Sequence, residues 1–188
     1  YVDGVTVRGQ VPLGPSQKIH ISDILLDIVR EGFQELVTGA RLARGRFTLI
    51  RLVGKGGMGA VWLASDEVHN RQVALKLLPA EMAHDASCLQ DLEREVAKTS
   101  TLQHTNILRI EGLVRTEGEP PFILMEYVTG PEAMAGTDLN ELRRQNPNKL
   151  MLWSGVRHYM LQLCDALEYA HNQQIAHRDI KPSNLLIN

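Results

Sequence analysis

The fold is decided by residues 47–64, which read FTLIRLVGKGGMGAVWLA. Two apolar runs of strand length flank a glycine cluster of the form G-x-G-x-x-G-x-V. Glycines let a backbone approach a phosphate closely, because no Cβ obstructs the N–H groups. The cluster alone is also typical of a tight turn between strands, and a dinucleotide-binding turn shares its pattern. A dinucleotide-binding turn opens a helix, however, and a P-loop ends in Gly-Lys-Ser/Thr, whereas here a second strand follows. The stretch therefore predicts a strand, a glycine loop and a second strand.

The next part of the sequence predicts three more strands and one helix. Residues 72–78 form a third apolar run, which Pro79 closes. Residues 87–102 set charged positions against apolar ones at helical spacing. Two further apolar runs, 107–114 and 122–128, flank a polar turn and predict a hairpin. The expected fold class is α+β, with a five-stranded antiparallel sheet and one helix.

Helices are expected after an irregular stretch at 129–137. A short helix is predicted at about 138–145 and a long one at about 153–172. Apolar residues of the long helix recur at spacings of three and four and define one face: Val156, Tyr159, Met160, Leu163, Leu167 and Ala170. A continuous apolar face needs cover, so we expect self-association or a partner at this helix.

Residues 1–45 are expected to form an N-terminal extension with one amphipathic helix. Ser22 and Asp23 offer an N-cap and an acidic first turn for a helix that runs to about Val37, and Gly39 follows as a stop. Both a linker helix and a dimerisation or regulatory helix fit this pattern. The expected domain boundaries are 1–45, 46–128 and 129–188.

Composition argues against several classes of protein. The 188 residues carry a formal net charge of −2, so no overall attraction to nucleic acid is expected. No run approaches the roughly 18 apolar residues of a membrane helix, so no membrane segment is expected within the chain. Cys88 and Cys164 lie far apart and suggest neither a disulfide framework nor a zinc site, which favours the cytoplasm. Tyr1 in place of methionine suggests a longer reading frame, whose other parts could carry a membrane anchor.

Lys76 ends the tetrad Val73-Ala74-Leu75-Lys76 in an otherwise apolar strand. An ammonium group at the margin of a buried strand needs an anionic partner, unless the side chain extends into solvent. Glu95 on the following helix is the best placed carboxylate. A Lys76–Glu95 ion pair would hold the ammonium toward a phosphate.

Residues 177–184 read HRDIKPSN and carry the strongest chemical signal. Asp179 can accept a proton from an attacking hydroxyl, and Lys181 can neutralise charge on a transferred phosphoryl group. Asn184 can offer an oxygen to Mg²⁺. This combination predicts phosphoryl transfer.

The ordered set of motifs resembles the protein kinase family. The resemblance covers about residues 46–188, with 46–128 as the small lobe and hinge and 129–188 as the beginning of the large lobe. The Gly-Gly-Met-Gly form and Lys181 after Asp179 resemble bacterial serine/threonine kinases. The resemblance implies ATP and Mg²⁺ as cofactors and the serine or threonine hydroxyl of a protein as substrate.

The resemblance also implies residue roles. Lys76, paired with Glu95, would contact the α- and β-phosphates, and the backbone of Glu126 to Val128 would form the hinge that binds adenine. Asp179 would be the catalytic base, Lys181 a γ-phosphate contact and Asn184 a Mg²⁺ ligand. Glu132 and Asp138 both remain candidates for the ribose. The rest of the expected ATP site comprises Val53, Gly54, Lys55, Gly56, Gly57, Met58, Gly59, Ala60, Val61, Ala74 and, at the back of the adenine pocket, Met125.

The sequence departs from the family pattern because it contains no Asp-Phe-Gly, whose aspartate holds Mg²⁺. The activation segment that follows this motif in the family is also missing. We therefore expect a kinase as the parent protein and an inactive chain in isolation. A pseudokinase or ATP-binding scaffold is the main alternative, and a small-molecule phosphotransferase of the same fold is a further one.

Overall fold

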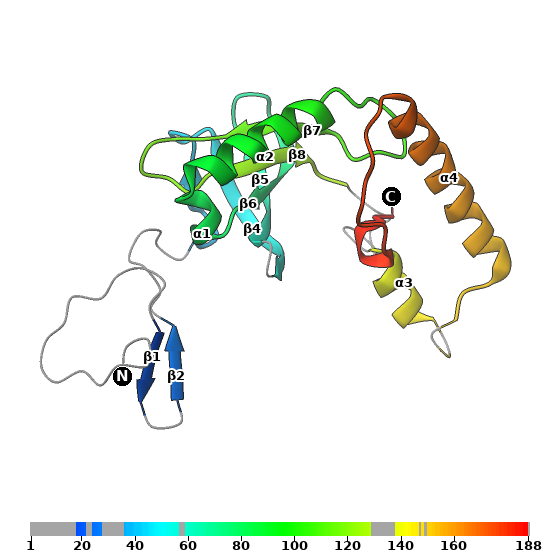
Figure 1. Ribbon diagram of the computed structural model, residues 1–188, viewed down its shortest axis with the longest axis horizontal. Coiled ribbons are helices and arrows are strands. Elements are labelled where there is room, and N and C mark those ends of the chain that lie inside the picture. Colours follow the sequence, from blue (N-terminus) through cyan, green and yellow to red (C-terminus); the bar gives the residue numbers. More distant parts are fainter. Residues whose placement is uncertain are drawn as a thin grey trace, which may run out of the picture. The chain divides into compact units, whose positions relative to one another are not determined.

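Six strands form one antiparallel sheet in the computed structural model (Figure 1). Their order is β3-β4-β5-β6-β8-β7, and they comprise Arg41–Leu42, Phe47–Gly56, Gly59–Asp66, Arg71–Leu77, Phe122–Glu126 and Ile110–Val114 respectively. Five of them are the predicted strands, so the predicted α+β class and antiparallel sheet are confirmed. The sixth, β3, was not predicted, because two residues are too few for a periodic signal.

The structure describes residues 18–21, 24–27, 36–56, 59–128, 138–146, 148 and 150–187. The chain divides into two units, Tyr1–Leu36 and Val37–Asn188, and each is treated by itself. No helix in the described ranges is long and apolar enough to span a membrane.

The predicted N-terminal helix is wrong wherever the structure describes its residues. Ile24–Asp27 is a strand, β2, which pairs antiparallel with β1, Lys18–Ile21. The pairing joins Ile21 to Ile24 and Ile19 to Leu26, and such apolar cross-strand pairs suit a hairpin. Ser22 and Asp23 suggested an N-cap, but the same residue types are equally typical of a turn. Val37 at the predicted helix end is not helical, and residues 28–35 lie outside the described ranges.

One face of the large sheet forms the core of the small lobe. The register pairs Leu49 with Ala64, Leu75 with Leu124 and Leu77 with Phe122, and all these side chains are buried. Phe47 and Phe122 meet edge to face, with ring centroids 5.5 Å apart. Because side chains alternate along a strand, residues 61, 63, 74, 76, 123 and 125 point to the opposite face.

Two helices follow β6. The short α1, Ala80–Ala83, precedes α2, Ala86–Thr99, where the sequence predicted one helix at 87–102. The carboxylate of Asp85 caps α2, because it accepts hydrogen bonds from the backbone N–H groups of Ser87 and Cys88 at 2.9 and 3.0 Å. Figure 1 shows α2 lying across the sheet near β7 and β8.

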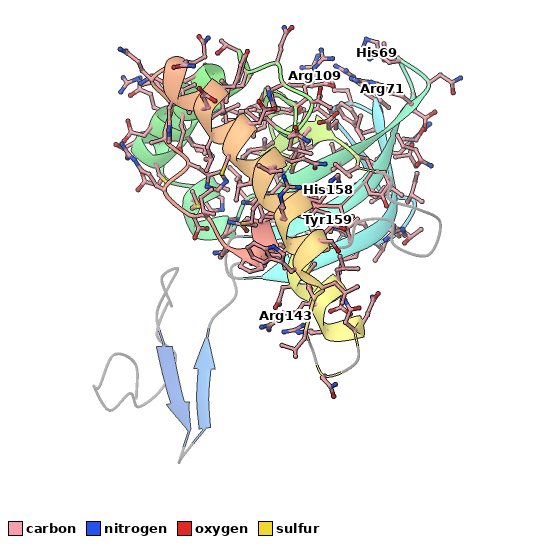
Figure 2. All side chains as sticks on the ribbon, turned by 90° about the vertical axis from the view of Figure 1, so that its right-hand side faces the viewer. His69, Arg71, Arg109, Arg143, His158 and Tyr159 are labelled. Carbon is pink, nitrogen blue, oxygen red and sulfur yellow. The ribbon has the colours of Figure 1, made fainter. Side chains whose placement is uncertain are left out.

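A buried carboxylate links three strands and the turn before β4 at one end of the sheet. Asp66 is fully buried and accepts two hydrogen bonds from the Arg46 guanidinium, at 3.1 and 2.9 Å. His69 Nδ1 lies 2.8 Å from the same carboxylate, and Arg71 bridges onward to Glu111 through two contacts of 2.6 Å. Figure 2 shows His69 and Arg71 close together at this end of the sheet. The hydrogen bonds from Arg46 hold the pKa of Asp66 well below its usual range.

The helices of the large lobe begin with α3, Leu139–Gln145, whose N-cap is Asp138. The long α4, Trp153–Asn172, agrees with its prediction, and the 3₁₀ helix η2 covers Pro182–Asn184. The N–H of Leu139 donates to the carbonyl of Leu185 at 2.8 Å, so α3 and η2 are packed side by side (Figure 1). On α4, Ala166 and Ala170 are buried, whereas Met160 remains 37% exposed.

The loop after α2 is bound to α4 through His104. The backbone N–H of Asn106 donates to His104 Nδ1 at 3.1 Å, so the proton of a neutral ring is on Nε2. That nitrogen lies 3.2 Å from the Asp165 carboxylate, and the ring packs on Tyr169 with centroids 5.1 Å apart. Tyr169 Oη also accepts from the N–H of Gln103 at 3.2 Å. These contacts join the two lobes at the side away from β4.

The Asp66 cluster gives a test by pH and mutation. We expect Asp66→Asn to lower the free energy of unfolding at pH 7 by about 2 kcal/mol, because charged hydrogen bonds at a buried carboxylate are lost. The folded pKa lies below the unfolded value of about 3.9, so this stabilisation is present above about pH 4 and is lost as the pH falls toward the folded pKa. Urea unfolding followed between pH 7 and pH 3 measures it.

Asp91→Asn is the matched control, because Asp91 is an exposed carboxylate that also pairs with an arginine, Arg94, at 3.3 Å. A change within about 0.5 kcal/mol is expected there. Equal effects of the two substitutions would show that burial of Asp66 contributes nothing.

Candidate active site

The glycine hairpin is formed by β4 and β5, and its last described pair is Gly56 with Gly59. Residues 57–58 lie outside the described ranges. Gly59 has φ +108°, and a Cβ at this position would lie 2.0 Å from the carbonyl oxygen of Leu77. Only glycine fits such a place. At Gly54, by contrast, a Cβ would meet nothing within 4 Å.

Four residues of the expected ATP site lie on one face of the sheet. The register pairs Val61 with Lys76 and Ala74 with Met125, and directly opposed residues share a face. Ala74 and Met125 are buried, whereas Val61 and Lys76 are half-buried. Val53 lies at a bulge between the pairs Leu52–Trp62 and Gly54–Val61. The sheet therefore brings an ammonium group to the margin of an apolar platform beside the glycine hairpin.

The predicted ion pair between Lys76 and Glu95 is not formed. Glu95 is exposed on α2, and among the described residues neither side chain has an ion pair or a side-chain hydrogen bond. The reason lies in the orientation of α2, which turns Leu89 and Val96 inward as its buried residues. The carboxylate of Glu95 is left on the solvent side of the helix.

The hinge follows β8 and is held from two sides. The carboxylate of Glu126 accepts from the N–H of Arg109 at 2.7 Å, and the N–H of Glu126 donates to the carbonyl of Arg109 at 3.0 Å. On the other side, Arg51 Nη2 donates to Tyr127 Oη at 2.6 Å. Val128 comes next in the chain. The Glu126 side chain therefore has a structural partner, while the backbone of residues 127–128 lies outside the strand.

The catalytic-loop residues converge on Asp179. Lys181 Nζ lies 2.8 Å from its carboxylate, and Asn184 Nδ2 donates to the carboxylate at 2.9 Å and to the Asp179 carbonyl at 2.8 Å. Hydrogen bonding to Lys181, and then to Asn184, lowers the pKa of Asp179. The turn itself depends on Arg178, which adopts φ +63°. The side chains of Lys181 and Asn184 therefore hold the Asp179 carboxylate in one position.

Asp138, one of the two ribose candidates, serves as the N-cap of α3. Its Oδ1 accepts from the N–H of Glu141 at 2.8 Å. Glu132, the other candidate, lies outside the described residues. The choice between them stays open.

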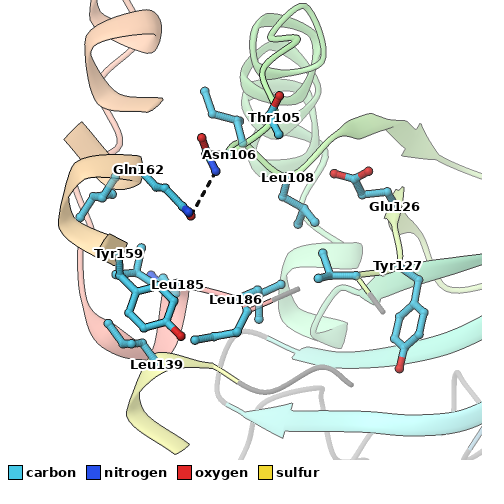
Figure 3. A pocket seen from close by; sticks show the side chains of 15 residues that line it. Thr105, Asn106, Leu108, Glu126, Tyr127, Leu139, Tyr159, Gln162, Leu185 and Leu186 are labelled. Atoms are coloured by element: carbon cyan, nitrogen blue, oxygen red, sulfur yellow. Dashed lines mark hydrogen bonds between the residues drawn. The ribbon is translucent and has the colours of Figure 1, made fainter. Parts of the chain in front are cut away.

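A cavity of about 400 Å³ lies between the hinge, the loop at 105–108, α4 and residues 184–187 (Figure 3). Asn106 donates to Gln162 across it at 3.3 Å. Glu126, Tyr127 and Val128 line the cavity, but Lys76 and Asp179 do not. The cavity therefore adjoins the hinge without containing the residues expected to carry out the chemistry.

Sequence reasoning missed Arg51 and the Asp66 cluster. Arg51 and Tyr127 are 76 positions apart, and no local pattern links them. Asp66, His69 and Arg71 are closer together, at the turn between two strands. Opposite charges bracketing a short turn are a weak signal of such a cluster.

A glycine hairpin beside a lysine-bearing strand, followed by a loop that gathers Asp179, Lys181 and Asn184, is typical of proteins with the kinase fold. The family described as "Protein kinase domain" matches residues 47–188. The chain belongs to this family.

Curated relatives include the serine/threonine-protein kinase PrkC of Bacillus subtilis, 36% identical over 152 residues that cover 81% of this chain and 22% of that protein. PksC of Streptomyces coelicolor is also 36% identical, over 84% of this chain and 28% of that protein. The crystal structure of the Mycobacterium tuberculosis PknI kinase domain matches with a TM-score of 0.67 and 27% identity, covering 80% of this chain and 56% of that one. The chain thus spans less than a third of these two curated relatives.

The requirement for glycine at residue 59 gives a second test. We expect Gly59→Ala to weaken nucleotide binding at least tenfold and to destabilise the fold by about 2 kcal/mol, because the added methyl group meets the Leu77 carbonyl at a positive φ. A fluorescent ATP analogue and thermal melting measure the two effects. Gly54→Ala is the control, with a loss of stability below about 1 kcal/mol. Identical behaviour of the two variants would contradict the packing argument.

Proposed function

We propose that the chain is the ATP-binding part of a serine/threonine protein kinase that transfers the γ-phosphoryl group of ATP to a protein hydroxyl. The convergence of Lys181 and Asn184 on the Asp179 carboxylate is the observation that carries the proposal. Phosphoryl transfer depends on positioning and charge neutralisation, and this loop supplies a base and a cation in one turn.

In the proposed mechanism, Asp179 accepts the proton of the attacking hydroxyl. Lys181 holds this carboxylate through their ion pair and would also contact the γ-phosphoryl group. Lys76 faces the α- and β-phosphates, and the glycine hairpin covers them with backbone N–H groups. Val61, Ala74 and Met125 form the apolar surface on which adenine lies.

Asn184 fits a Mg²⁺ site beside Asp179. Its amide nitrogen is used by Asp179, while its amide oxygen has no hydrogen-bond partner among the described residues. No cluster of three or more His, Cys, Asp or Glu side chains suited to a metal occurs in the described ranges. Mg²⁺ commonly takes one or two protein oxygens together with phosphate oxygens, so a single amide suits an ion that arrives with ATP. Bound Mg²⁺ would neutralise charge on the phosphates.

The unformed Lys76–Glu95 pair supports a second candidate, an ATP-binding scaffold without transfer activity. Protein kinases need this pair in place for catalysis. In a kinase, α2 would have to turn Glu95 inward when nucleotide binds. In a scaffold, α2 would keep its present orientation.

The main test separates binding from transfer. We expect the 188-residue chain to bind Mg-ATP, and Lys76→Met to weaken binding about tenfold, because an ammonium–phosphate contact is lost. In the full reading frame that encodes the chain, Asp179→Asn should reduce transfer to protein at least a thousandfold while nucleotide affinity changes less than about threefold. Titration with a fluorescent ATP analogue and transfer of labelled phosphate measure these effects. Nucleotide binding without Asp179-dependent transfer would favour the scaffold.

A cytoplasmic location and self-association are also part of the proposal. Met160 on the apolar face of α4 is 37% exposed, and most other residues of that face are only half-buried. We expect light scattering to show concentration-dependent dimers, and Met160→Lys to shift them toward monomers by placing a charge in the contact. A monomer at all concentrations would contradict this expectation.

A further inference from the structure

Arg51 and Tyr127 form a direct contact between the strand that leads into the glycine hairpin and the hinge. Arg51 Nη2 donates to Tyr127 Oη at 2.6 Å, and the guanidinium carbon lies 5.9 Å from the centroid of the tyrosine ring. The hydrogen bond has a charged donor, which is the stronger kind. The ring distance is at the outer limit of a cation–π contact.

This contact joins parts of the sheet that backbone hydrogen bonds do not join. Two strands, β5 and β6, separate β4 from β8 in the sheet. Within the described residues, no other hydrogen bond or ion pair links 47–56 to 122–128. Arg51 lies between two irregularities of the β4–β5 register, at Leu49/Arg51 and Leu52/Gly54. Bulges of this kind redirect a side chain out of the regular alternation.

Tyr127 follows a residue, Glu126, that two hydrogen bonds hold in place. Its neighbour Glu126 is held to Arg109 by a backbone hydrogen bond and a carboxylate hydrogen bond. The Arg51–Tyr127 hydrogen bond therefore connects β4 to a hinge that is itself held in place, and it opposes motion of the glycine hairpin relative to the hinge. Val53 follows Arg51 by two residues and Val128 follows Tyr127 by one, so the contact spans the two walls of the expected nucleotide site.

We propose that Arg51 and Tyr127 are positioning residues that clasp the glycine-hairpin strand to the hinge and slow the release of bound nucleotide. The inference rests on the proposed function, because it assigns a role at the same ATP site. Neither side chain is assigned a part in the chemistry. Loss of the clasp lets β4 move away from the hinge, which loosens the cover over the phosphates.

The test measures affinity and dissociation of a fluorescent ATP analogue with Mg²⁺ on the 188-residue chain. Arg51→Ala and Tyr127→Phe should each raise the dissociation constant about fivefold, mostly through the dissociation rate, because one partly exposed charged hydrogen bond is lost. The double variant should be no weaker than either single one, since both remove the same bond. Arg51→Lys should recover part of the affinity.

Arg41→Ala is the matched control, because Arg41 is an exposed arginine of the same sheet whose side chain has no hydrogen bond or ion pair among the described residues. Its dissociation rate should equal that of the unmodified chain. Circular dichroism of nucleotide-free samples should show every variant folded to the same extent.

Each outcome decides a different point. Unchanged release from Arg51→Ala and Tyr127→Phe, additive effects in the double variant, or weakening that merely follows lost folding would overturn the clasp and leave the proposed function standing. Failure of the unmodified chain to bind the nucleotide would overturn both.

Discussion

The candidate site depends on the antiparallel register of β5, β6 and β8. Pairing Val61 with Lys76 and Ala74 with Met125 places these four side chains on one face, and the alternation of the same strands sends Leu75, Leu77 and Phe122 into the core. A shift of one residue in any of these strands would exchange the two faces. The strand register that packs the core is therefore the same register that assembles the candidate site.

The buried Asp66 cluster supports that register at one end of the sheet. Arg46 lies in the turn before β4, Asp66 ends β5, Arg71 begins β6 and Glu111 lies in β7, so one chain of ion pairs joins three strands and the turn that leads into a fourth. The opposite end of β4 and β5 carries the glycine hairpin, whereas the hinge leaves β8 at the same end as the cluster, because Glu126 pairs with Val73.

The two lobes contribute different kinds of chemistry. The sheet presents an ammonium group and an apolar platform, whereas η2 and the preceding loop present the Asp179 carboxylate with the Lys181 ammonium beside it. In the proposed kinase, α2 is the element that would have to turn the exposed Glu95 toward Lys76. His104 binds the loop after α2 to Asp165 and Tyr169 of α4, so a reorientation of α2 would take place about a point anchored to the large lobe.

The sequence by itself determined the five main strands, the long helix and the protein kinase family, because hydrophobic periodicity and the HRDIKPSN run are local signals. It was wrong at Ile24–Asp27, where an apolar run next to Ser and Asp suits a hairpin as well as a capped helix. Only the tertiary structure decided three further features: β3, the orientation of Glu95 and the Arg51–Tyr127 contact. Strand β3 depends on pairing with β4, Glu95 on which side of α2 is buried, and Arg51 on a partner 76 residues away. These depend on packing between distant segments, which no local pattern of residues encodes.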